Sequence, residues 1–358
     1  MRRIKLVVSD FHLGTGRYRP DGTRNELEDF YFGEKFVEFL EHHRTGEFHD
    51  CEVELVINGD FFNLLQLPEV ADGGDAFTEG VCLDLMERVL VGHRRVFDAL
   101  RQFNGGAGRS IRFVMGNHDP GLAFEGVQRR LRERVGGEVA FSLQHYDFDG
   151  VHVEHGNQFD PLNSFDPRAL FLTRGFPEPV VNLPWGSQFL LHVMTPEKAL
   201  RPYLDKVTPH GRFLRWALLN DTRWFIRVSF RTLGFFLSSL LTRRAHRRFG
   251  LRALVRALLA YSPSPTLDRE AQRLLQGVGY QTVVFGHTHV ALFREFAGGG
   301  TYINTGSWNH VTSLDVGSLG RHVRLTYAFL EWAPGDARWT PHLREWRGYH
   351  RVVEEIYR

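Results

Sequence analysis

Cysteine and lysine are scarce in this chain of 358 residues. Its two cysteines, Cys51 and Cys82, form no C-x-x-C or other metal-type spacing, and one pair makes no disulfide framework. This argues against a disulfide-stapled fold and fits a reduced, cytoplasmic compartment. Arginine carries most of the positive charge, because the sequence has only four lysines: Lys5, Lys35, Lys198 and Lys206.

Long apolar segments are also missing. The N-terminal run in MRRIKLVVSD is too short for a secretory signal, and the run from Leu233 to Leu241 is too short to span a bilayer. Hydrophobic residues make up 42% and charged residues 24%, as in ordinary soluble proteins, and the net charge is only +2. We therefore expect a cytoplasmic protein with one large domain, or one domain with an insertion, and no overall charge that favours nucleic acid.

Short apolar runs of strand length recur along the chain. They are residues 4–9, 53–58, 111–115, 151–155, 282–286 and 301–304. Several are continuous rather than alternating, as is typical of strands that are buried on both faces. Helical patterns over 34–43 and 79–103 lie between the early runs. The alternation predicts an α/β architecture.

The middle of the chain has a different character. Strand signals fade from about Pro161 to Pro265, and residues 212–256 hold eleven arginines and a single acid, Asp221. We interpret 161–267 as a largely helical, arginine-rich insertion. It interrupts a catalytic domain that comprises 1–160 and 268–358.

Five of the strand-like runs end in residues of the types that bind metal ions. In chain order the motifs are Asp10-Phe11-His12, Asn58-Gly59-Asp60, Gly116-Asn117-His118-Asp119, His155-Gly156-Asn157 and Gly286-His287-Thr288-His289. Ligands bind outside the carboxyl ends of strands in open α/β sheets, so we expect the motifs to converge. Carboxylates with imidazoles suit zinc, iron or manganese. Two neighbouring cations need a bridging carboxylate, and Asp60 is placed to provide it.

Each motif alone also has an ordinary explanation. Asp10 suits a helix cap, and a single histidine at a strand end is more often part of a core or a turn. The five motifs together, in this order and each after a strand, predict a two-metal site.

The blocks DFH, GDFFN, GNHD, HG and GHTH resemble those of the calcineurin-like metallophosphoesterase family. The segment YINTGSW (302–308) is similar to the strand and turn that often follow the last block. The resemblance covers about 1–160 and 270–330. It implies an α/β fold, a β-sandwich flanked by helices (αββα), with two metal ions at one edge.

The resemblance also implies roles for individual residues. One divalent ion would be held by Asp10, His12, Asp60 and His289. The other would be held by Asp60, Asn117, His155 and His287. His118 would face the phosphate, and Asp119 would orient His118 through its other ring nitrogen. Asn63 stands where many relatives carry an acid, a position that the family does not generally use as a direct ligand.

The expected reaction is cleavage of a phosphoester or pyrophosphate bond by a metal-activated hydroxide, with manganese favoured over iron or zinc. The chain contains no G-x-S-x-G elbow and no Walker A loop. Two alternatives remain open. One is a metal-dependent nuclease or phosphodiesterase acting on nucleic acid, and the other is a non-catalytic peripheral membrane scaffold.

The arginines of 212–256 are interleaved with Phe, Trp and Leu. Such a helix can lie on the inner face of a membrane or grip a phosphorylated lipid, which would make the protein peripheral there. It can equally pack as a helical cap with solvated arginines. Nucleic acid is less favoured because the segment is rich in apolar residues. An inserted helical lid also resembles the UDP-2,3-diacylglucosamine pyrophosphohydrolases, which commonly carry Arg in place of His118 and HGD in place of HGN.

A few polar residues near the motifs are candidates for binding a phosphorylated small-molecule or lipid substrate. They are Arg17, Asn157, Asp160 and Asn163. Arg17 and Arg19 suit contact with substrate phosphate, or they are ordinary loop arginines. The segment 157–163 forms either a pocket wall or a well-capped turn.

Overall fold

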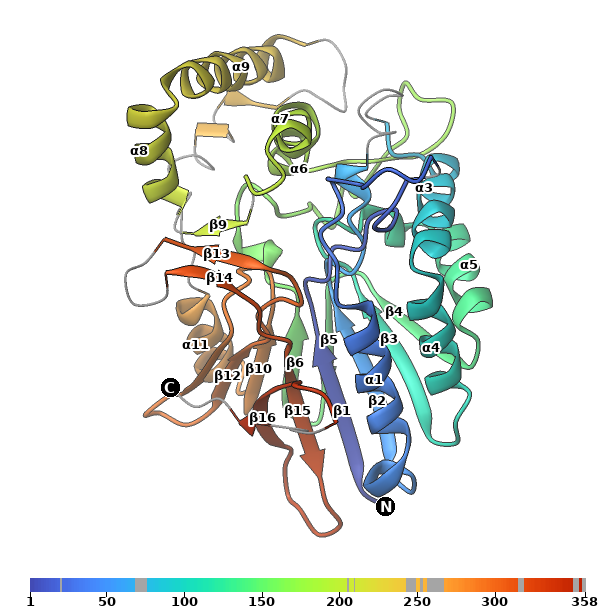
Figure 1. Ribbon diagram of the computed structural model, residues 1–358. Coiled ribbons are helices and arrows are strands. Elements are labelled where there is room, and N and C mark those ends of the chain that lie inside the picture. Colours follow the sequence, from blue (N-terminus) through green and yellow to red (C-terminus); the bar gives the residue numbers. More distant parts are fainter. Residues whose placement is uncertain are drawn as a thin grey trace.

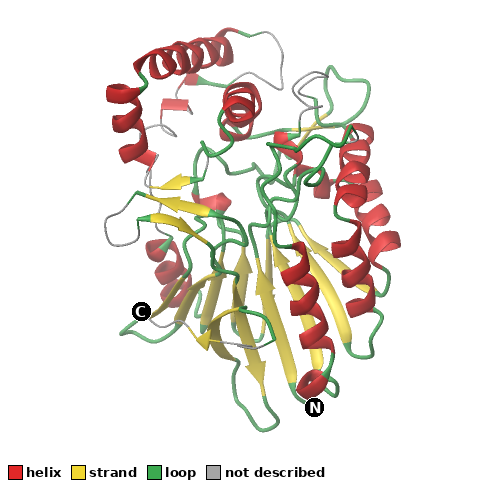
Figure 2. Cartoon of the chain, viewed as in Figure 1, coloured by secondary structure: helices red, strands yellow, loops and turns green. Residues whose placement is uncertain are grey.

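The computed structural model describes residues 1–19, 21–67, 76–204, 206–208, 210–242, 249–251, 254–255, 267–314, 319–349 and 354–355. Two β-sheets stack face to face, and helices cover their outer faces (Figures 1 and 2). This arrangement confirms the predicted αββα class.

The larger sheet has seven strands in the order β17-β16-β15-β1-β2-β3-β4. Its parallel half comprises β1 (Arg3–Val8), β2 (Glu52–Asn58), β3 (Arg109–Val114) and β4 (Glu138–Ser142). The antiparallel half comprises β15 (Thr326–Trp332), β16 (Thr340–Glu345) and β17 (Glu354–Glu355). Val8 of β1 pairs with Ile57 of β2, which pairs with Phe113 of β3, so these three strands end at nearly the same level.

The smaller sheet has five strands in the order β11-β12-β10-β6-β5. They are β11 (Leu292–Glu295), β12 (Thr301–Asn304), β10 (Thr282–Phe285), β6 (Val151–Glu154) and β5 (His145–Phe148). β6, β10 and β12 run parallel to one another. The sequence-predicted strands are all present, whereas β4, β5, β11, β15 and β16 were not predicted.

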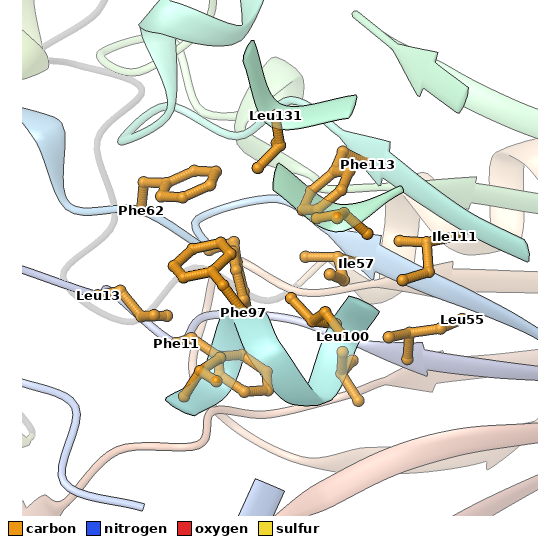
Figure 3. Packing of buried hydrophobic residues seen from close by; sticks show 14 of the residues in the cluster. Phe11, Leu13, Leu55, Ile57, Phe62, Phe97, Leu100, Ile111, Phe113 and Leu131 are labelled. Atoms are coloured by element: carbon orange, nitrogen blue, oxygen red, sulfur yellow. The ribbon is translucent and has the colours of Figure 1, made fainter. Parts of the chain in front are cut away.

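Successive side chains of each strand enter different layers of the core. Val56 of β2 packs between the two sheets, together with Val153 and Val284 of the smaller sheet. Its neighbours Leu55 and Ile57 face the helices instead. Figure 3 shows Phe97 and Leu100 gathered against Ile57 and Leu55 on this side. Continuous apolar runs were therefore the correct signal for these strands.

The helices that cover the larger sheet are α1 (Gly33–Arg44), α3 (Glu79–Gly92), α4 (Arg94–Asn104) and α5 (Glu125–Val135). The helix α11 (Asp268–Gly277) packs Ala271 and Leu275 on the smaller sheet. Short 3-10 turns lie in the connections: η1 (Gly46–Phe48), η2 (Leu64–Gln66), η3 (Pro120–Ala123) and η4 (Asn157–Phe159).

The helical pattern predicted over 79–103 is broken at His93 rather than continuous. The cause is a close approach of two backbones, because a Cβ on Gly92 would lie 2.2 Å from the carbonyl oxygen of Thr15. His93 Nε2 lies 3.2 Å from Glu28 Oε2 at the same place. The break thus holds the loop that follows β1.

The predicted insertion, residues 161–267, combines helices with short strands. Its elements are β7 (Phe171–Leu172), β8 (Val180–Val181), α6 (Trp185–Phe189), the π-helical η5 (Leu190–Met194), α7 (Thr195–Leu200), β9 (Val207–Thr208), α8 (His210–Asn220) and α9 (Thr222–Leu241). β9 pairs with β13 (Val311–Ser313), which pairs with β14 (Gly320–His322). Figure 1 shows α7, α8 and α9 together at one end of the sheets. The exact domain boundaries stay a prediction.

One helix in the described part of the chain, α9, is long and apolar enough to cross a membrane by length and composition alone. The sequence prediction considered only the shorter run within it. The helix is mostly exposed, since only 11% of its apolar window is buried.

The β5–β6 hairpin carries a buried histidine between two acids. His152 Nδ1 lies 2.6 Å from Asp147 Oδ1, and its Nε2 lies 2.9 Å from Glu154 Oε2. Burial disfavours the charged ring, but the hydrogen bonds and negative charge of Glu154 and Asp147 outweigh it and raise the pKa of His152 above the ordinary 6.5.

This pair of contacts predicts a pH-dependent stability. A raised folded pKa gives stabilisation that is fully present below pH 6.5 and is lost as pH rises through the folded pKa. In urea denaturation, the wild type should therefore lose its advantage over His152→Gln as pH rises above 6.5. The control is His49→Gln, which alters an exposed histidine. A difference between wild type and His152→Gln that stays constant with pH would contradict the assignment.

Candidate metal centre

The five predicted motifs come together at one edge of the sandwich. Asp10 and His12 follow β1, Asp60 follows β2, and Asn117 follows β3 in the larger sheet. His155 follows β6, and His287 and His289 follow β10 in the smaller sheet. The two sheets thus contribute ligand-type residues from opposite sides, because the strands that carry them end at a common edge.

Three overlapping groups of side chains have ligand atoms within 4.8 Å of one another. The groups are Asp10–His12–His289, His12–Asp60–His118 and Asp60–His155–His287. Asp60 belongs to two of them. Its Oδ2 lies 3.2 Å from His155 Nε2 and 3.9 Å from His12 Nε2. This is the position that a carboxylate bridging two cations requires.

The backbone at these residues adopts a conformation that side chains other than glycine rarely tolerate. Only six described non-glycine residues have a positive φ. Five of them are predicted metal ligands: Asp10 (57°), His12 (53°), Asp60 (50°), His287 (66°) and His289 (58°). Such backbone costs on the order of 1–3 kcal/mol per residue, and it clusters at functional sites.

Three buried atoms at the centre have no hydrogen-bond partner among the described residues. They are Asp10 Oδ1, Asn117 Oδ1 and His155 Nε2. Asp10 Oδ1 lies 3.2 Å from His289 Nε2, but this contact does not have hydrogen-bond geometry. An unsatisfied buried polar atom costs about 1–3 kcal/mol. Two divalent cations would satisfy all three atoms, so this donor set fits the implied metals.

Hydrogen bonds and nearby charged groups hold the predicted ligands in the form that binds a cation. His155 Nδ1 lies 2.8 Å from the carbonyl oxygen of Asn58 and, by donating to it, leaves Nε2 for a metal. Burial alone would raise the pKa of Asp60, but its interactions with His155 and His118 outweigh burial and hold the pKa well below the ordinary value. For Asp10, His289 and His155 likewise outweigh burial and lower the pKa. Both carboxylates are therefore anionic.

The turn that carries Asp10 is clamped from a distant part of the chain. Ser307 Oγ donates to the Asp10 carbonyl over 2.9 Å, and Asn309 Nδ2 donates to the Phe11 carbonyl over 2.8 Å. Sequence reasoning did not assign a role to either residue. The signal was available, since the YINTGSW segment contains Ser307.

The prediction that Asp119 orients His118 is wrong. The Asp119 carboxylate accepts backbone N–H groups, from Phe62 over 2.7 Å and from Phe61 and Gly116 over 3.3 Å. It is fully buried, and burial together with the charge of Asp60 raises its pKa to about 8. Asp119 thus ties the loop after β2 to the loop after β3 instead of touching the imidazole.

The partner of His118 is Asn63. His118 Nδ1 lies 2.9 Å from Asn63 Oδ1, and the backbone N–H of His118 donates to Asp60 Oδ1 over 2.8 Å. The His118 ring meets the His12 ring edge-on, with centroids 4.6 Å apart. The sequence signal for this contact is the position of Asn63 in GDFFN. Many members of the family that the motifs resemble carry an acid at this position.

The substrate-binding candidates are only partly brought to the centre. Asp160 Oδ2 lies 3.3 Å from His287 Nε2 and accepts from Asn163 Nδ2 over 2.6 Å. Asn157 is buried and donates to the carbonyl of Asn163 over 3.0 Å. These contacts support a capped turn beside a predicted ligand. Arg17 is exposed and stacks over Tyr31, 5.2 Å from the ring centroid, as an ordinary loop arginine does.

No protein-family model matches the chain, and no curated protein matches its sequence. Among solved structures, the chain is similar to a dimetal phosphatase from Danio rerio, with 12% identity over 99% of this chain and 97% of that chain and a TM-score of 0.37. It is similar to a putative 5′-nucleotidase from Staphylococcus aureus, with 10% identity over 99% of this chain and 54% of that chain and a TM-score of 0.34. It is also similar to Vps29 from Chaetomium thermophilum, with 10% identity over 99% and 96% and a TM-score of 0.34.

At such low identities and TM-scores, these similarities assign no activity or substrate to this chain. The fold and the five motifs describe this chain more specifically than these similarities do. The αββα sandwich with its strand-end ligand residues resembles the calcineurin-like metallophosphoesterases.

The close packing of the two loops at Gly116 generates a test of the centre. A Cβ there would lie 2.2 Å from Asp60 Oδ1 and 2.4 Å from the Asp60 backbone nitrogen, so Gly116→Ala must displace Asp60. We expect metal affinity to fall by about 10- to 100-fold, as measured by isothermal titration with Mn²⁺. Gly234→Ala is the matched control, because nothing lies near that glycine. Unchanged affinity in Gly116→Ala would exclude Asp60 as a ligand.

Proposed function

We propose that the chain is a dimetal phosphohydrolase that cleaves a phosphoester or pyrophosphate bond. The observation that carries the proposal is the strained backbone at five converging ligand residues around the shared carboxylate of Asp60. Bound at this centre, two divalent cations would supply a nucleophile from water at neutral pH and offset charge on the phosphoryl group. The carboxylate, imidazole and amide donors suit manganese, which we propose as the native metal, as well as iron and zinc.

The residues of the chain would then position the phosphate and move a proton. His118 has its Nδ1 occupied by Asn63, which leaves Nε2 to face the centre. In its imidazolium form, which carries a hydrogen on both nitrogens, His118 would donate from Nε2 to a phosphoryl oxygen or protonate the leaving oxygen. Asp119 contributes indirectly by holding the Asp60 and His118 loops together. A complete ligand set argues against a non-catalytic scaffold.

Hydrolysis of bis-p-nitrophenyl phosphate in the presence of Mn²⁺ tests this proposal. We expect His118→Ala to lower kcat by about 100- to 10,000-fold, the usual range for a lost general acid or base. Asp60→Ala should abolish activity and reduce bound metal. The matched control is His145→Ala, which removes a more exposed histidine on β5. If His118→Ala or Asp60→Ala kept full activity, the site assignment would be wrong.

We further propose that the substrate is lipid-linked or nucleotide-linked, and that the insertion contacts the inner membrane surface. The supporting feature is α9, which contacts the rest of the protein through arginines and through packed aromatic residues. Buried Glu197 of α7 accepts hydrogen bonds from Arg227 over 2.7 Å, from Arg231 over 3.3 Å and from Trp224 over 3.0 Å. The helix is therefore held by its arginines and also by aromatic contacts, because Trp224 packs in a cluster with Phe213 and the ring centroid of Phe235 lies 5.5 Å from that of Trp185.

A second set of apolar residues on α9 is turned outward. Its exposed residues recur every three or four positions: Ile226, Phe230, Leu233, Leu237 and Leu241. Phe230 is 70% and Leu241 80% exposed. The neighbouring α8 exposes Leu214, Trp216 and Leu219 as well. An outward apolar surface fits a bilayer interface and does not fit the solvated, basic groove that nucleic acid requires.

Sedimentation with vesicles tests this contact. The protein should bind vesicles that contain phosphatidylglycerol, and the double variant Phe230→Glu/Leu237→Glu should lose at least about tenfold in affinity, because charge is costly in the interface. Val91→Glu is the control, since it places the same charge at an exposed position on α3. Absence of vesicle binding by the wild type, or salt-sensitive binding to DNA instead, would contradict the proposal.

A further inference from the structure

A buried cluster of charges joins the insertion to the catalytic domain. Lys198 of α7 is fully buried, and its Nζ lies 2.5 Å from Asp29 Oδ2. Lys206 Nζ lies 2.7 Å from the other oxygen, Asp29 Oδ1. Two of the four lysines in this arginine-rich chain thus meet at one carboxylate. Asp29 itself belongs to the loop that follows the first motif.

The cluster continues to the histidine at the metal centre. Asn63 Nδ2 donates to Asp29 Oδ2 over 3.2 Å and to Gln66 Oε1 over 2.8 Å, and Lys198 donates to Gln66 Oε1 over 3.0 Å. The opposite end of the same amide, Asn63 Oδ1, lies 2.9 Å from His118 Nδ1. A continuous series of contacts therefore runs from α7 to His118.

Each hydrogen bond in this series of contacts has a defined donor and a defined acceptor. The Asp29 carboxylate accepts from two ammonium groups, and it pairs with the amide nitrogen of Asn63 rather than with the amide oxygen. The amide oxygen must then face His118, so that Nδ1 carries a hydrogen and donates it. His118 is consequently held with Nδ1 toward Asn63, which leaves Nε2 as the nitrogen available to a phosphate.

A contribution to the stability of the fold does not by itself explain why these charged residues are buried together. Burying charges is costly, and replacing a buried ion pair by apolar residues of similar size is often neutral or stabilising. Lys198 also sits next to Glu197, the residue that holds α9. The two adjacent side chains of α7 therefore link the exposed helix on one side to His118 on the other.

We propose that Lys198, together with Lys206, is a positioning residue for His118 and acts through Asp29 and Asn63. The insertion thereby sets the tautomer and orientation of the histidine that faces the phosphate. This role rests on the proposed function, because His118 matters only if the centre hydrolyses phosphate esters.

The tautomer of His118 gives a direct readout that needs no turnover. Long-range ¹H–¹⁵N spectra of zinc-loaded, ¹⁵N-histidine-labelled protein should show His118 protonated at Nδ1 in the wild type, with the signal assigned by its loss in His118→Gln. Asp29→Asn and Lys198→Met should shift this signal toward the Nε2-protonated form, because Asn63 is then free to flip. Lys35→Met is the control, since Lys35 makes an exposed pair with Glu38.

A double-mutant cycle gives the kinetic readout. In manganese-loaded protein, Lys198→Met should lower kcat by about tenfold, part of the general acid–base contribution, and leave KM and metal content unchanged. In the His118→Ala background it should have no further effect, whereas a merely structural role would lower activity in both backgrounds.

If Lys198→Met does not fold, as judged by near-ultraviolet circular dichroism, Lys206→Met and Asp29→Asn provide the same comparisons. An unchanged His118 tautomer, or an equal loss of activity in both backgrounds, would overturn the positioning role and leave the proposed function intact. Absence of metal-dependent hydrolysis by the wild type would overturn both.

Discussion

The fold at this site depends on one buried anion, the carboxylate of Asp60. It lies within two groups of metal-ligand type, and three features serve to place it. The backbone turns at a positive φ immediately after β2, Gly116 leaves room for the carboxylate, and the backbone N–H of His118 donates to it. A strained backbone and a buried charge both cost free energy. Positive charge around Asp60 offsets this free energy, first from imidazoles and, in the proposed enzyme, from cations.

The fold and the convergence of the ligand-type residues were accessible from sequence because both follow from local patterns. Continuous apolar runs identified the buried strands, and the polar residues that end them identified the edge. What the sequence did not reveal depends on contacts between distant loops. Asp119 lies next to His118 in the chain, yet its carboxylate accepts hydrogen bonds from the backbone of residues 61 and 62. Asn63 contacts the His118 ring instead. The break at His93 likewise reflects the approach of Thr15, which no local pattern records.

The helix α9 shows what the spacing of apolar and basic residues can and cannot predict. The spacing of apolar and basic residues in α9 correctly indicated an amphipathic helix, but not which side faces the protein. Buried Glu197 accepts hydrogen bonds from Arg227 and Arg231, and Trp224 and Phe235 of the same helix pack on the protein beside them. Lys198, the neighbour of Glu197, contacts Asp29 and Gln66 in the catalytic domain. One short helix thus connects an outward apolar surface with the polar series that ends at His118.

The pairing of β9 with β13 has a consequence for synthesis of the chain. Val207 and Thr312 are register partners although they are far apart in sequence, and Ser307 and Asn309, which clamp the Asp10 turn, lie just before β13. Contacts of such large sequence separation form late, because the intervening chain must first be made and its loop closed. During translation, the apolar helices α8 and α9 therefore leave the ribosome before β13, the strand that pairs with β9, has been made.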